Sequence, residues 1–224
     1  MAQDNLGRRA YDAELERLQA EAEDSRMTDP AQIRRLYTAV ITHLQAQNAQ
    51  LHQKLITDPL TGLFNRNTLL ERLNAAQREA DQLGIPYSVV FADLDDFKKV
   101  NEGYGHPIGD RVLQDAATTI RGIVRSDDVL AYRYGGEEVL LVAPRTDETQ
   151  AARLVERVAD EFRKARVGEG YLGHAITITA GAASWHKGMT PAQVIEAANY
   201  GMRERKKAGK DGHYLAKRGE IPLK

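Results

Sequence analysis

The sequence carries two short groups of acidic residues whose types and spacing could hold a metal ion. One is the pair Glu137-Glu138 in YRYGGEEVLLV, which follows two glycines and precedes an apolar run. The other is in FADLDDFKKVN, where an apolar run leads into Asp93, Asp95 and Asp96. Carboxylates that meet repel one another strongly, and a divalent cation is the simplest group that holds them together. Because all these donors are oxygens, magnesium or manganese is favoured over zinc.

The residues beside these acids are of types that bind phosphate. Gly135 and Gly136 permit positive φ angles and a close backbone approach, which suits a hairpin wrapped around a bulky anion. A helix is expected to begin at Asp96, Phe97 and Lys98, so that its backbone amides face a phosphate. The residues therefore indicate metal-assisted nucleotidyl or phosphoryl transfer, with a plain acidic surface as the alternative.

Two lysines near the C-terminal end add positive charge for the same group. Lys206 and Lys210 lie one helical turn apart and could contact one triphosphate. Two other motifs are excluded. An EF-hand loop counted from Asp93 has Lys98 where glycine is required, and GYGHPIGDR lacks the Gly-Lys-Ser/Thr ending of a P-loop.

The elements that must position these residues alternate between strands and helices from residue 58 onward. Apolar periodicity predicts, in order, a helix at 68–83, a strand at 87–93, a helix at 108–124, strands at 129–134 and 139–142, a helix at 151–162, a strand at 174–184 and a last helix that opens at Thr190-Pro191. The β-α-β-β-α-β order predicts an α+β, ferredoxin-like fold, an antiparallel sheet with its helices on one face. The end of the central strand and the hairpin turn then share one edge, which is expected to bring the carboxylates together.

Residues 1–57 differ in composition from the rest of the chain, and their pattern predicts two helices, at about 8–26 and 30–56. Asp29-Pro30 has the pattern of a helix cap followed by a proline in the first turn. Apolar residues on the second helix alternate at spacings of four and three, with polar Gln47 interrupting them: Ile33, Tyr37, Val40, Leu44 and Leu51. This heptad-like pattern favours a dimerising helical hairpin or coiled coil, and an amphipathic helix packed on its own domain is the alternative.

The composition excludes several classes of protein. The 224 residues, 42% hydrophobic and 28% charged, are typical of a globular chain with one sizeable domain and a smaller appendage. Cysteine is absent, which excludes disulfides and thiolate metal sites and is typical of a cytoplasmic protein. The sequence has no apolar run of membrane-spanning length and a net charge of −1, so neither a membrane protein nor an electrostatic nucleic-acid binder is expected.

Four motifs in order make the chain similar to the GGDEF family of diguanylate cyclases: DPLTGLFNR, DLDDFKKVNEGYGHPIGD, RYGGEEV and KKAGKDG. The resemblance covers residues 58–214, about 70% of the chain, and predicts a GGDEF catalytic domain at 58–216 between the helical segment 1–57 and a basic tail at 217–224. It implies an enzyme that joins two GTP molecules into cyclic di-GMP and releases two pyrophosphates. Each domain holds one GTP, so two domains must meet face to face, and the N-terminal helices are expected to supply the homodimer.

The resemblance also implies roles for the acidic residues. Asp93, the main-chain carbonyl of Leu94 and Glu138 match the positions that hold two magnesium ions, with manganese as the alternative. Glu137 matches a position assigned either to metal binding or to activation of the ribose 3′-hydroxyl, and both roles stay open.

Nucleotide contacts are implied by the same resemblance. Asn101 and Asp110 match the pair that binds guanine in the family. The residue types suit this role, because an amide and a carboxylate can accept from N1–H and N2–H₂ while the amide donates to O6. His106 is expected to be structural. The positions that match phosphate contacts are the amides near Asp96, Phe97 and Lys98 and the side chains of Lys206 and Lys210.

The chain departs from the family pattern in several places, two of which concern binding sites. Lys210 replaces an arginine, which keeps the charge and loses the bidentate fork. Arg125 and Asp128 resemble the family's Arg-x-x-Asp product-inhibition site, but six residues instead of five separate them from the first motif glycine. A shift of one residue turns strand side chains to the opposite face unless a bulge absorbs it, so two surface charges are the alternative to an inhibitory site for cyclic di-GMP.

Two other functions stay open from the residues. A degenerate GGDEF domain would bind GTP or cyclic di-GMP as a sensor or scaffold, and a helical interaction protein would carry the C-terminal domain as cargo. Six retained residues favour the active cyclase: Asp93, Asn101, Asp110, Glu137, Glu138 and Lys206.

Overall fold

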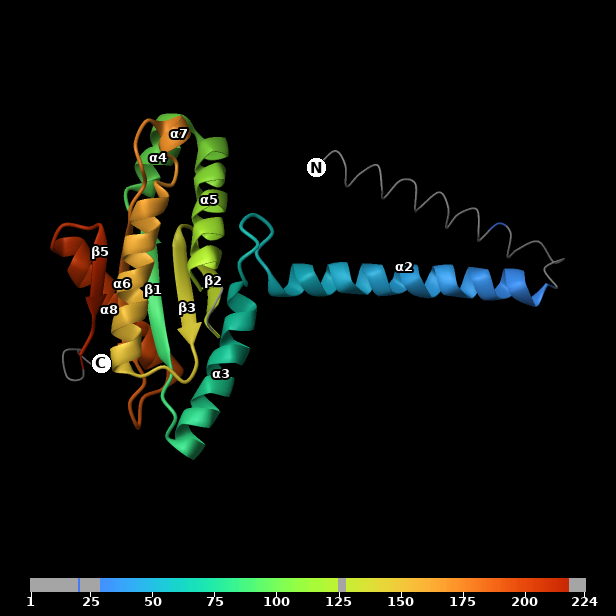
Figure 1. The fold of residues 1–224 in the computed structure, drawn as a ribbon, viewed down its shortest axis with the longest axis horizontal. Coiled ribbons are helices and arrows are strands. Elements are labelled where there is room, and N and C mark those ends of the chain that lie inside the picture. Colours follow the sequence, from blue (N-terminus) through green and yellow to red (C-terminus); the bar gives the residue numbers. More distant parts are fainter. Residues whose placement is uncertain (1–19, 21–28, 125–127, 218–224) are drawn as a thin grey trace. The chain divides into compact units, whose positions relative to one another are not determined.

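The computed structural model describes residues 20, 29–124 and 128–217, and the chain divides into two compact units, Met1–Lys54 and Leu55–Lys224 (Figure 1). Helix α2 spans Pro30–Ile56, from the first unit to the start of the second. Its first turn is capped as the sequence predicts, because the Ala31 N–H donates to the Asp29 carboxylate at 2.9 Å. The predicted helix 30–56 is confirmed, whereas the predicted helix 8–26 lies outside the described residues, apart from the helical residue 20.

Large apolar side chains lie exposed along the first half of α2. Tyr37 is 66% exposed, Leu44 57% and Ile41 52%. They follow one another at spacings of four and three residues, which is typical of a helix that packs against another helix. The side chain of Leu51, further along the predicted seam, lies outside the described residues. Tyr37 and Leu44 belong to the predicted seam, whereas Ile41 takes the place of Val40 in the exposed stripe, and the dimer through this stripe stays a prediction.

The second unit is built around a five-stranded sheet in the order β2-β3-β1-β4-β5. The strands are β1 Ser88–Leu94, β2 Leu130–Gly135, β3 Glu138–Ala143, β4 Ile178–Ser184 and β5 Gly212–Leu215. Central β1 pairs antiparallel with β3 and β4, and β2 pairs antiparallel with β3. The predicted ferredoxin-like arrangement is therefore confirmed. β5, which pairs parallel with β4, is absent from the prediction because its four residues are too few for a periodic signal.

Helices cover both faces of this sheet, which corrects the expectation that they lie on one face. The four long helices of this unit are α3 Arg66–Leu83, α5 His106–Val124, α6 Glu148–Ala165 and α8 Pro191–Lys207. Val90, Ala92 and Leu94 of β1 belong to the core that α5 and α6 cover, whereas Val89 and Phe91 belong to the core under α3 and α8. A strand buried on both sides reads as a continuous apolar run, so its sequence does not reveal the second layer.

A hairpin at residues 56–65 joins α2 to α3 and lies along the outer edge of β2. The Ile56 carbonyl accepts a hydrogen bond from the Asn65 N–H at 2.9 Å, and the Asn65 side chain caps α3. The Phe64 N–H donates to the Ala131 carbonyl at 3.0 Å, and the Arg133 N–H donates to the Phe64 carbonyl at 2.8 Å. The DPLTGLFNR motif is therefore hydrogen-bonded to the strand that leads into the glycine turn.

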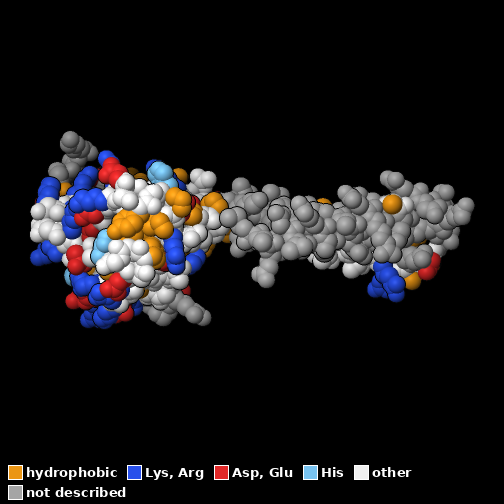
Figure 2. Space-filling view, turned by 90° about the horizontal axis from the view of Figure 1, so that it is seen from above, with side chains coloured by type: hydrophobic (Ala, Val, Ile, Leu, Met, Phe, Trp, Pro, Cys, Tyr) orange, Lys and Arg blue, Asp and Glu red, His pale blue; other side chains and the backbone are white. Residues whose placement is uncertain are grey.

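Two short helices complete the second unit, α4 Phe97–Tyr104 after β1 and α7 Glu169–Leu172 before β4. α4 begins where the sequence predicts a helix start. Within the described ranges, no helix has both the length and the apolar character needed to cross a membrane. Figure 2 shows Lys and Arg side chains interspersed with Asp and Glu around an apolar area of this unit, so charge on the visible face is not gathered into one large patch of a single sign.

Candidate functional site

Two of the predicted acidic residues, Asp93 and Glu138, meet at one end of the sheet, where β1 and β3 lie side by side. Asp93 of β1 is directly opposite Glu138 of β3, which places their Cβ atoms about 5 Å apart. Lys206, in the last turn of α8, reaches this pair, with its Nζ 2.5 Å from Oδ1 of Asp93. The Asp93 side chain is 13% exposed and that of Lys206 is 29% exposed. Two carboxylates and one ammonium therefore share a half-buried site.

Burial and mutual repulsion make these carboxylates costly to ionise. Burial raises the pKa of Asp93, the Lys206 ammonium opposes this in part, and the charges of Glu137 and Asp95 raise it further. Burial also raises the pKa of Glu138, to which the charges of Asp93 and Glu137 add. An oxygen-donor site whose anions repel one another suits a divalent cation such as Mg²⁺.

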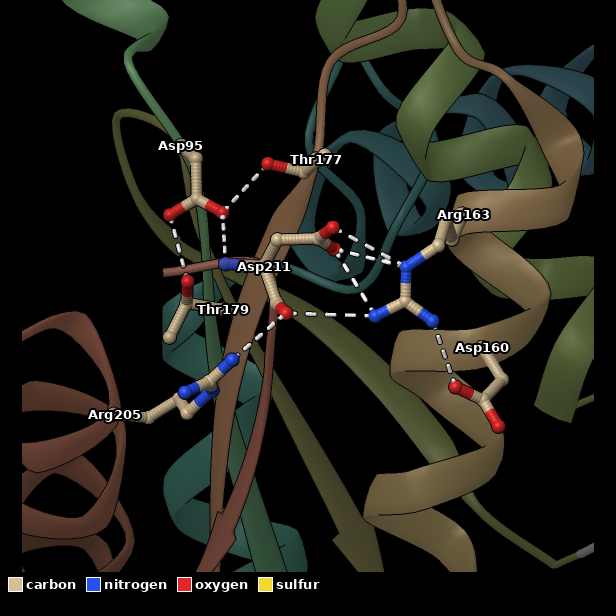
Figure 3. A network of polar contacts seen from close by, with 7 residues as sticks. All are labelled: Asp95, Asp160, Arg163, Thr177, Thr179, Arg205 and Asp211. Atoms are coloured by element: carbon tan, nitrogen blue, oxygen red, sulfur yellow. Dashed lines mark hydrogen bonds and ion pairs between the residues drawn. The ribbon is translucent and has the colours of Figure 1, made fainter. Parts of the chain in front are cut away.

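Asp95 does not join this acidic group, contrary to the expectation that it projects beside Asp93. Asp95 is 4% exposed, and its carboxylate accepts hydrogen bonds from the hydroxyls of Thr177 at 2.8 Å and Thr179 at 2.7 Å (Figure 3). β1 ends at Leu94, so strand alternation does not extend to Asp95. Across the described ranges, no group of three or more Asp, Glu or His side chains is already gathered closely enough to hold a metal. The expected meeting of carboxylates is therefore confirmed for Asp93 and Glu138 and wrong for Asp95.

The turn from β1 into α4 carries the residues predicted to bind phosphate. Asp96 adopts φ 57°, in the left-handed region, immediately before the first residue of α4. The first N–H groups of a helix have no partner within it, so Phe97 and Lys98 offer backbone donors here, while the Phe97 side chain is buried. Lys99 and Lys210 both pair with the Asp96 carboxylate, at 2.8 Å and 3.0 Å. This turn therefore combines amides with two ammonium groups.

The predicted base-binding residues lie on α4 and α5. Asn101 is half-buried on α4, and Asp110 is exposed near the start of α5. A Cβ built on Gly109 would lie 1.9 Å from Oδ1 of Asn101, so the amide passes directly over the Gly109 backbone, next to Asp110. The Asn101 amide thus lies against the residue that precedes Asp110, and their joint contact with a base stays a prediction. His106 is exposed at the first residue of α5.

Arg133 braces the turn formed by Gly135 and Gly136. Its Nε donates to the Gly136 carbonyl at 3.0 Å, and its Nη1 lies 3.1 Å from both carboxylate oxygens of Asp58. Gly136 has φ 50°, a conformation that favours glycine. Burial raises the pKa of Asp58, but the hydrogen bonds from Thr61 and the charge of Arg133 outweigh it and hold that pKa below its usual value. The DPLTGLFNR motif therefore fixes the GGEE turn through a charged contact.

Two hollows lie near the predicted residues. One, of about 330 Å³, adjoins the turn from β1 into α4, and its lining includes Asp96 and Tyr104 but neither Asp93 nor Glu138. The other, of about 420 Å³, lies by the start of β2 and is lined by Asp128, Val129, Pro144, Arg145, Thr146, Gln150, Arg153, Leu154 and Arg157. Arg125, the other half of the predicted product-inhibition pair, lies outside the described residues.

Three residues that the sequence left without a role take part in this geometry. Gly109 leaves space for the Asn101 amide, and Asp58 anchors Arg133. The Arg66 guanidinium lies 4.7 Å from the centroid of the Tyr134 ring, and its charge partly offsets the raised pKa of Glu138. Asp58 and Arg66 are the first and last residues of DPLTGLFNR, which is the signal that could have found them.

Comparison with known proteins agrees with this geometry. Residues 55–212 match the family model described as diguanylate cyclase, GGDEF domain. The response regulator PleD of Caulobacter vibrioides is 35% identical over 159 residues, which are 70% of this chain and 35% of PleD. The probable diguanylate cyclase DgcT of Escherichia coli is 33% identical over 157 residues, 69% of this chain and 34% of DgcT. This chain therefore spans about a third of the length of these relatives.

Solved structures are similar as well. The coiled coil and GGDEF domain of DgcB from Caulobacter crescentus, in complex with c-di-GMP, has a TM-score of 0.72 at 27% identity and covers 80% of this chain and 95% of its own. The diguanylate cyclase SiaD from Pseudomonas aeruginosa, in complex with its activator SiaC, has a TM-score of 0.68 at 30% identity and covers 96% of this chain and 82% of its own. With its motifs, its sheet and this match, the chain belongs to the GGDEF-domain family of diguanylate cyclases.

Proposed function

We propose that this chain is a diguanylate cyclase, which condenses two GTP molecules into cyclic di-GMP and releases two pyrophosphates. The observation that carries the proposal is the pairing of Asp93 with Glu138 at the sheet end that Lys206 also reaches. Relatives named as diguanylate cyclases support the reaction, among them DgcP of Pseudomonas aeruginosa, which is 34% identical over 172 residues, 76% of this chain and 25% of DgcP.

The carboxylates are the proposed metal ligands. Asp93, the Leu94 carbonyl and Glu138 would hold two Mg²⁺ ions, with Mn²⁺ as the alternative, and the donor set fits because it consists of oxygens whose charges repel one another. Bound there, the ions would supply charge neutralisation for the phosphates and would lower the pKa of the attacking hydroxyl. Glu137 either adds a further ligand or accepts the proton of the ribose 3′-hydroxyl.

The chain's own polar groups bind and orient the nucleotide. Asn101 and Asp110 accept from the guanine N1–H and N2–H₂ groups, which sets the base apart from adenine. The first amides of α4 and the ammonium of Lys210 offset the charge of the triphosphate. Lys206 is paired with Asp93, and we expect it to turn to phosphate once cations carry the counter-charge.

Two domains must meet for this reaction, since each holds one GTP and the new bonds join two nucleotides. We propose a homodimer through the exposed α2 seam of Tyr37, Ile41 and Leu44, supported by the coiled coil in the DgcB structure. Leu44→Lys is expected to shift the protein to monomer in sedimentation and to lower cyclase activity at low concentration. Gln45→Lys adds the same charge at the next residue and serves as the control. Equal dimer content in both variants would count against the seam.

Product inhibition at Asp128 is proposed as well. The cavity of about 420 Å³ beside Asp128 is also lined by three arginines, Arg145, Arg153 and Arg157, whose charges suit a ligand with phosphates. The pairing of β2 with β3 shifts register between Arg133 and Gly135, a bulge of the kind that can absorb the extra residue before the turn. Asp128→Ala is expected to reduce inhibition by added cyclic di-GMP, and unchanged inhibition would refute this site.

The test of the main proposal is direct. Purified protein is mixed with GTP and Mg²⁺, and pyrophosphate and cyclic di-GMP are followed by chromatography over a range of protein concentrations. Product whose rate rises faster than the protein concentration supports a dimer-dependent cyclase. GTP binding without product at any concentration favours the alternative, a degenerate domain that senses GTP or cyclic di-GMP.

A further inference from the structure

The buried carboxylate of Asp95 holds the loop that follows α8. Its Oδ1 accepts from the Thr179 hydroxyl at 2.7 Å, and its Oδ2 accepts from the Thr177 hydroxyl at 2.8 Å and from the backbone N–H of Asp211 at 3.1 Å. Figure 3 shows Thr177, Thr179 and the backbone of Asp211 converging on Asp95. Asp95, which the sequence spacing predicts to lie in the metal site, therefore joins the end of β1 to the segment before β5.

Asp211 is held from its other side by arginines of two helices. The Nε of Arg163, on α6, lies 3.2 Å from both carboxylate oxygens of Asp211, and Arg163 Nη1 donates to Asp160 at 2.9 Å. The Asp211 carbonyl accepts from Nη2 of Arg205, on α8, at 3.2 Å (Figure 3). The backbone and the side chain of a single loop residue are thus bound by the end of β1, by α6 and by α8.

The loop that these contacts hold has an unfavourable backbone conformation. Lys210 and Asp211 are consecutive and have φ angles of 58° and 41°, in the left-handed region that disfavours residues other than glycine. Such conformations persist only where the surroundings over-determine them. The contacts of Asp211 do so, and the Nζ of Lys210 then lies 3.0 Å from the Asp96 carboxylate, beside the first turn of α4.

We propose that Asp95, Asp211 and Arg163 form a clamp that positions Lys210 for the triphosphate of the substrate. The clamp rests on the proposed function, which uses Lys210 as a phosphate contact. A lysine ammonium is a point charge on a flexible stem, without the fixed fork of a guanidinium, so the backbone decides where it can reach. The clamp residues are not among the proposed ligands of the nucleotide or the metal. They are positioning residues, and their effect passes through Lys210.

A double-mutant cycle on nucleotide binding tests the clamp. Arg163→Gln removes its half-exposed end and is expected to weaken binding of a non-hydrolysable GTP analogue about tenfold, with a raised KM for GTP and an unchanged kcat. Lys164→Gln removes the neighbouring exposed cation of α6 and is expected to leave binding unchanged. In a Lys210→Ala background, Arg163→Gln is expected to add no further loss, because residues that act as a unit are not additive.

Two results overturn the clamp: no loss of binding in Arg163→Gln, or a tenfold loss that persists in the Lys210→Ala background. Asp95→Asn keeps the shape and removes the charge, and it is expected to follow the same pattern. Calorimetry in the presence of Mg²⁺ measures the affinity for the GTP analogue and does not require turnover. It therefore tests the clamp even if the wild type forms no cyclic di-GMP. A wild type that does not bind the analogue refutes both the clamp and the proposed function.

Discussion

Gly109 offers a sharp test of base recognition, because its missing side chain leaves the space that the Asn101 amide occupies. In Gly109→Ala a Cβ would lie 1.9 Å from Oδ1 and 3.0 Å from Cγ of Asn101. Real Cβ atoms do not come within 3.0 Å of other heavy atoms, so the amide must move by about 1 Å. That displacement is large enough to break hydrogen bonds to a base.

The size of the effect can be worked out from the bonds lost. Two hydrogen bonds at about 0.5–1.5 kcal/mol each give about 1–3 kcal/mol, which corresponds to a rise of about 5- to 150-fold in the KM or Kd for GTP. Folding is expected to hold, because alanine is about 1 kcal/mol more favourable than glycine inside a helix. The loss should therefore fall on nucleotide binding and not on stability.

Gly122→Ala is the matched control on the same helix. A Cβ at Gly122 meets no atom within 4 Å, so this variant gains the same helix propensity without moving Asn101. Steady-state kinetics and calorimetry with GTP are compared for the wild type and the two variants, alongside urea unfolding. A folded Gly109→Ala protein with the GTP affinity of the wild type would refute the assignment of Asn101 to the base.

Three further perturbations test the metal pair, the brace and the core. Glu138→Gln is expected to lower turnover at least about 100-fold. The same variant should have a higher free energy of unfolding in urea without Mg²⁺, because a neutral amide relieves the repulsion with Asp93. Lower stability of this variant would contradict that repulsion. Arg133→Gln should cost about 1–3 kcal/mol of stability in thermal unfolding, because Arg133 and Asp58 are only 19% and 18% exposed. Since the pKa of Asp58 is lowered, this difference from wild type should persist at neutral pH and shrink as the pH falls below the usual carboxyl value of 3.8; a difference independent of pH would contradict the pairing. Burial raises the pKa of Tyr132 to about 12, so the unfolded chain ionises first and stability should fall between about pH 10 and 12, by up to about 1.4 kcal/mol per pH unit. Urea unfolding of Tyr132→Phe should show a shallower fall, and an equal slope would exclude Tyr132 as its cause.

Several features were predictable because they depend on local pattern and element order. Thr190 caps α8 with a capping box, as the Thr-Pro start predicts. Asp93 and Glu138 meet because the β-α-β-β-α-β order puts the end of β1 beside the start of β3. The arrangement of the sheet and the meeting of this pair follow from topology alone, and neither depends on side-chain detail.

Other features depend on tertiary contacts that no period encodes. The prediction for Asp95 extends strand alternation by one residue too many, because the chain leaves β1 at Leu94 and turns at Asp96. The space over Gly109 arises from the packing of α4 on α5, and sequence shows only a glycine beside an aspartate. The left-handed backbone at Lys210 is stabilised by residues distant in sequence, so a prediction from helical spacing places that lysine on α8, which ends at Lys207.

The hairpin at residues 56–65 has a consequence for solubility. An open strand edge is a template on which another chain can add. The bonds of Phe64 to Ala131 and Arg133 occupy part of the outer edge of β2, and at the opposite edge β5 has four residues. In the proposed homodimer, two copies would thereby associate through side chains and not by strand addition. Loss of the Phe64 contacts is therefore expected to cause aggregation, measurable by light scattering.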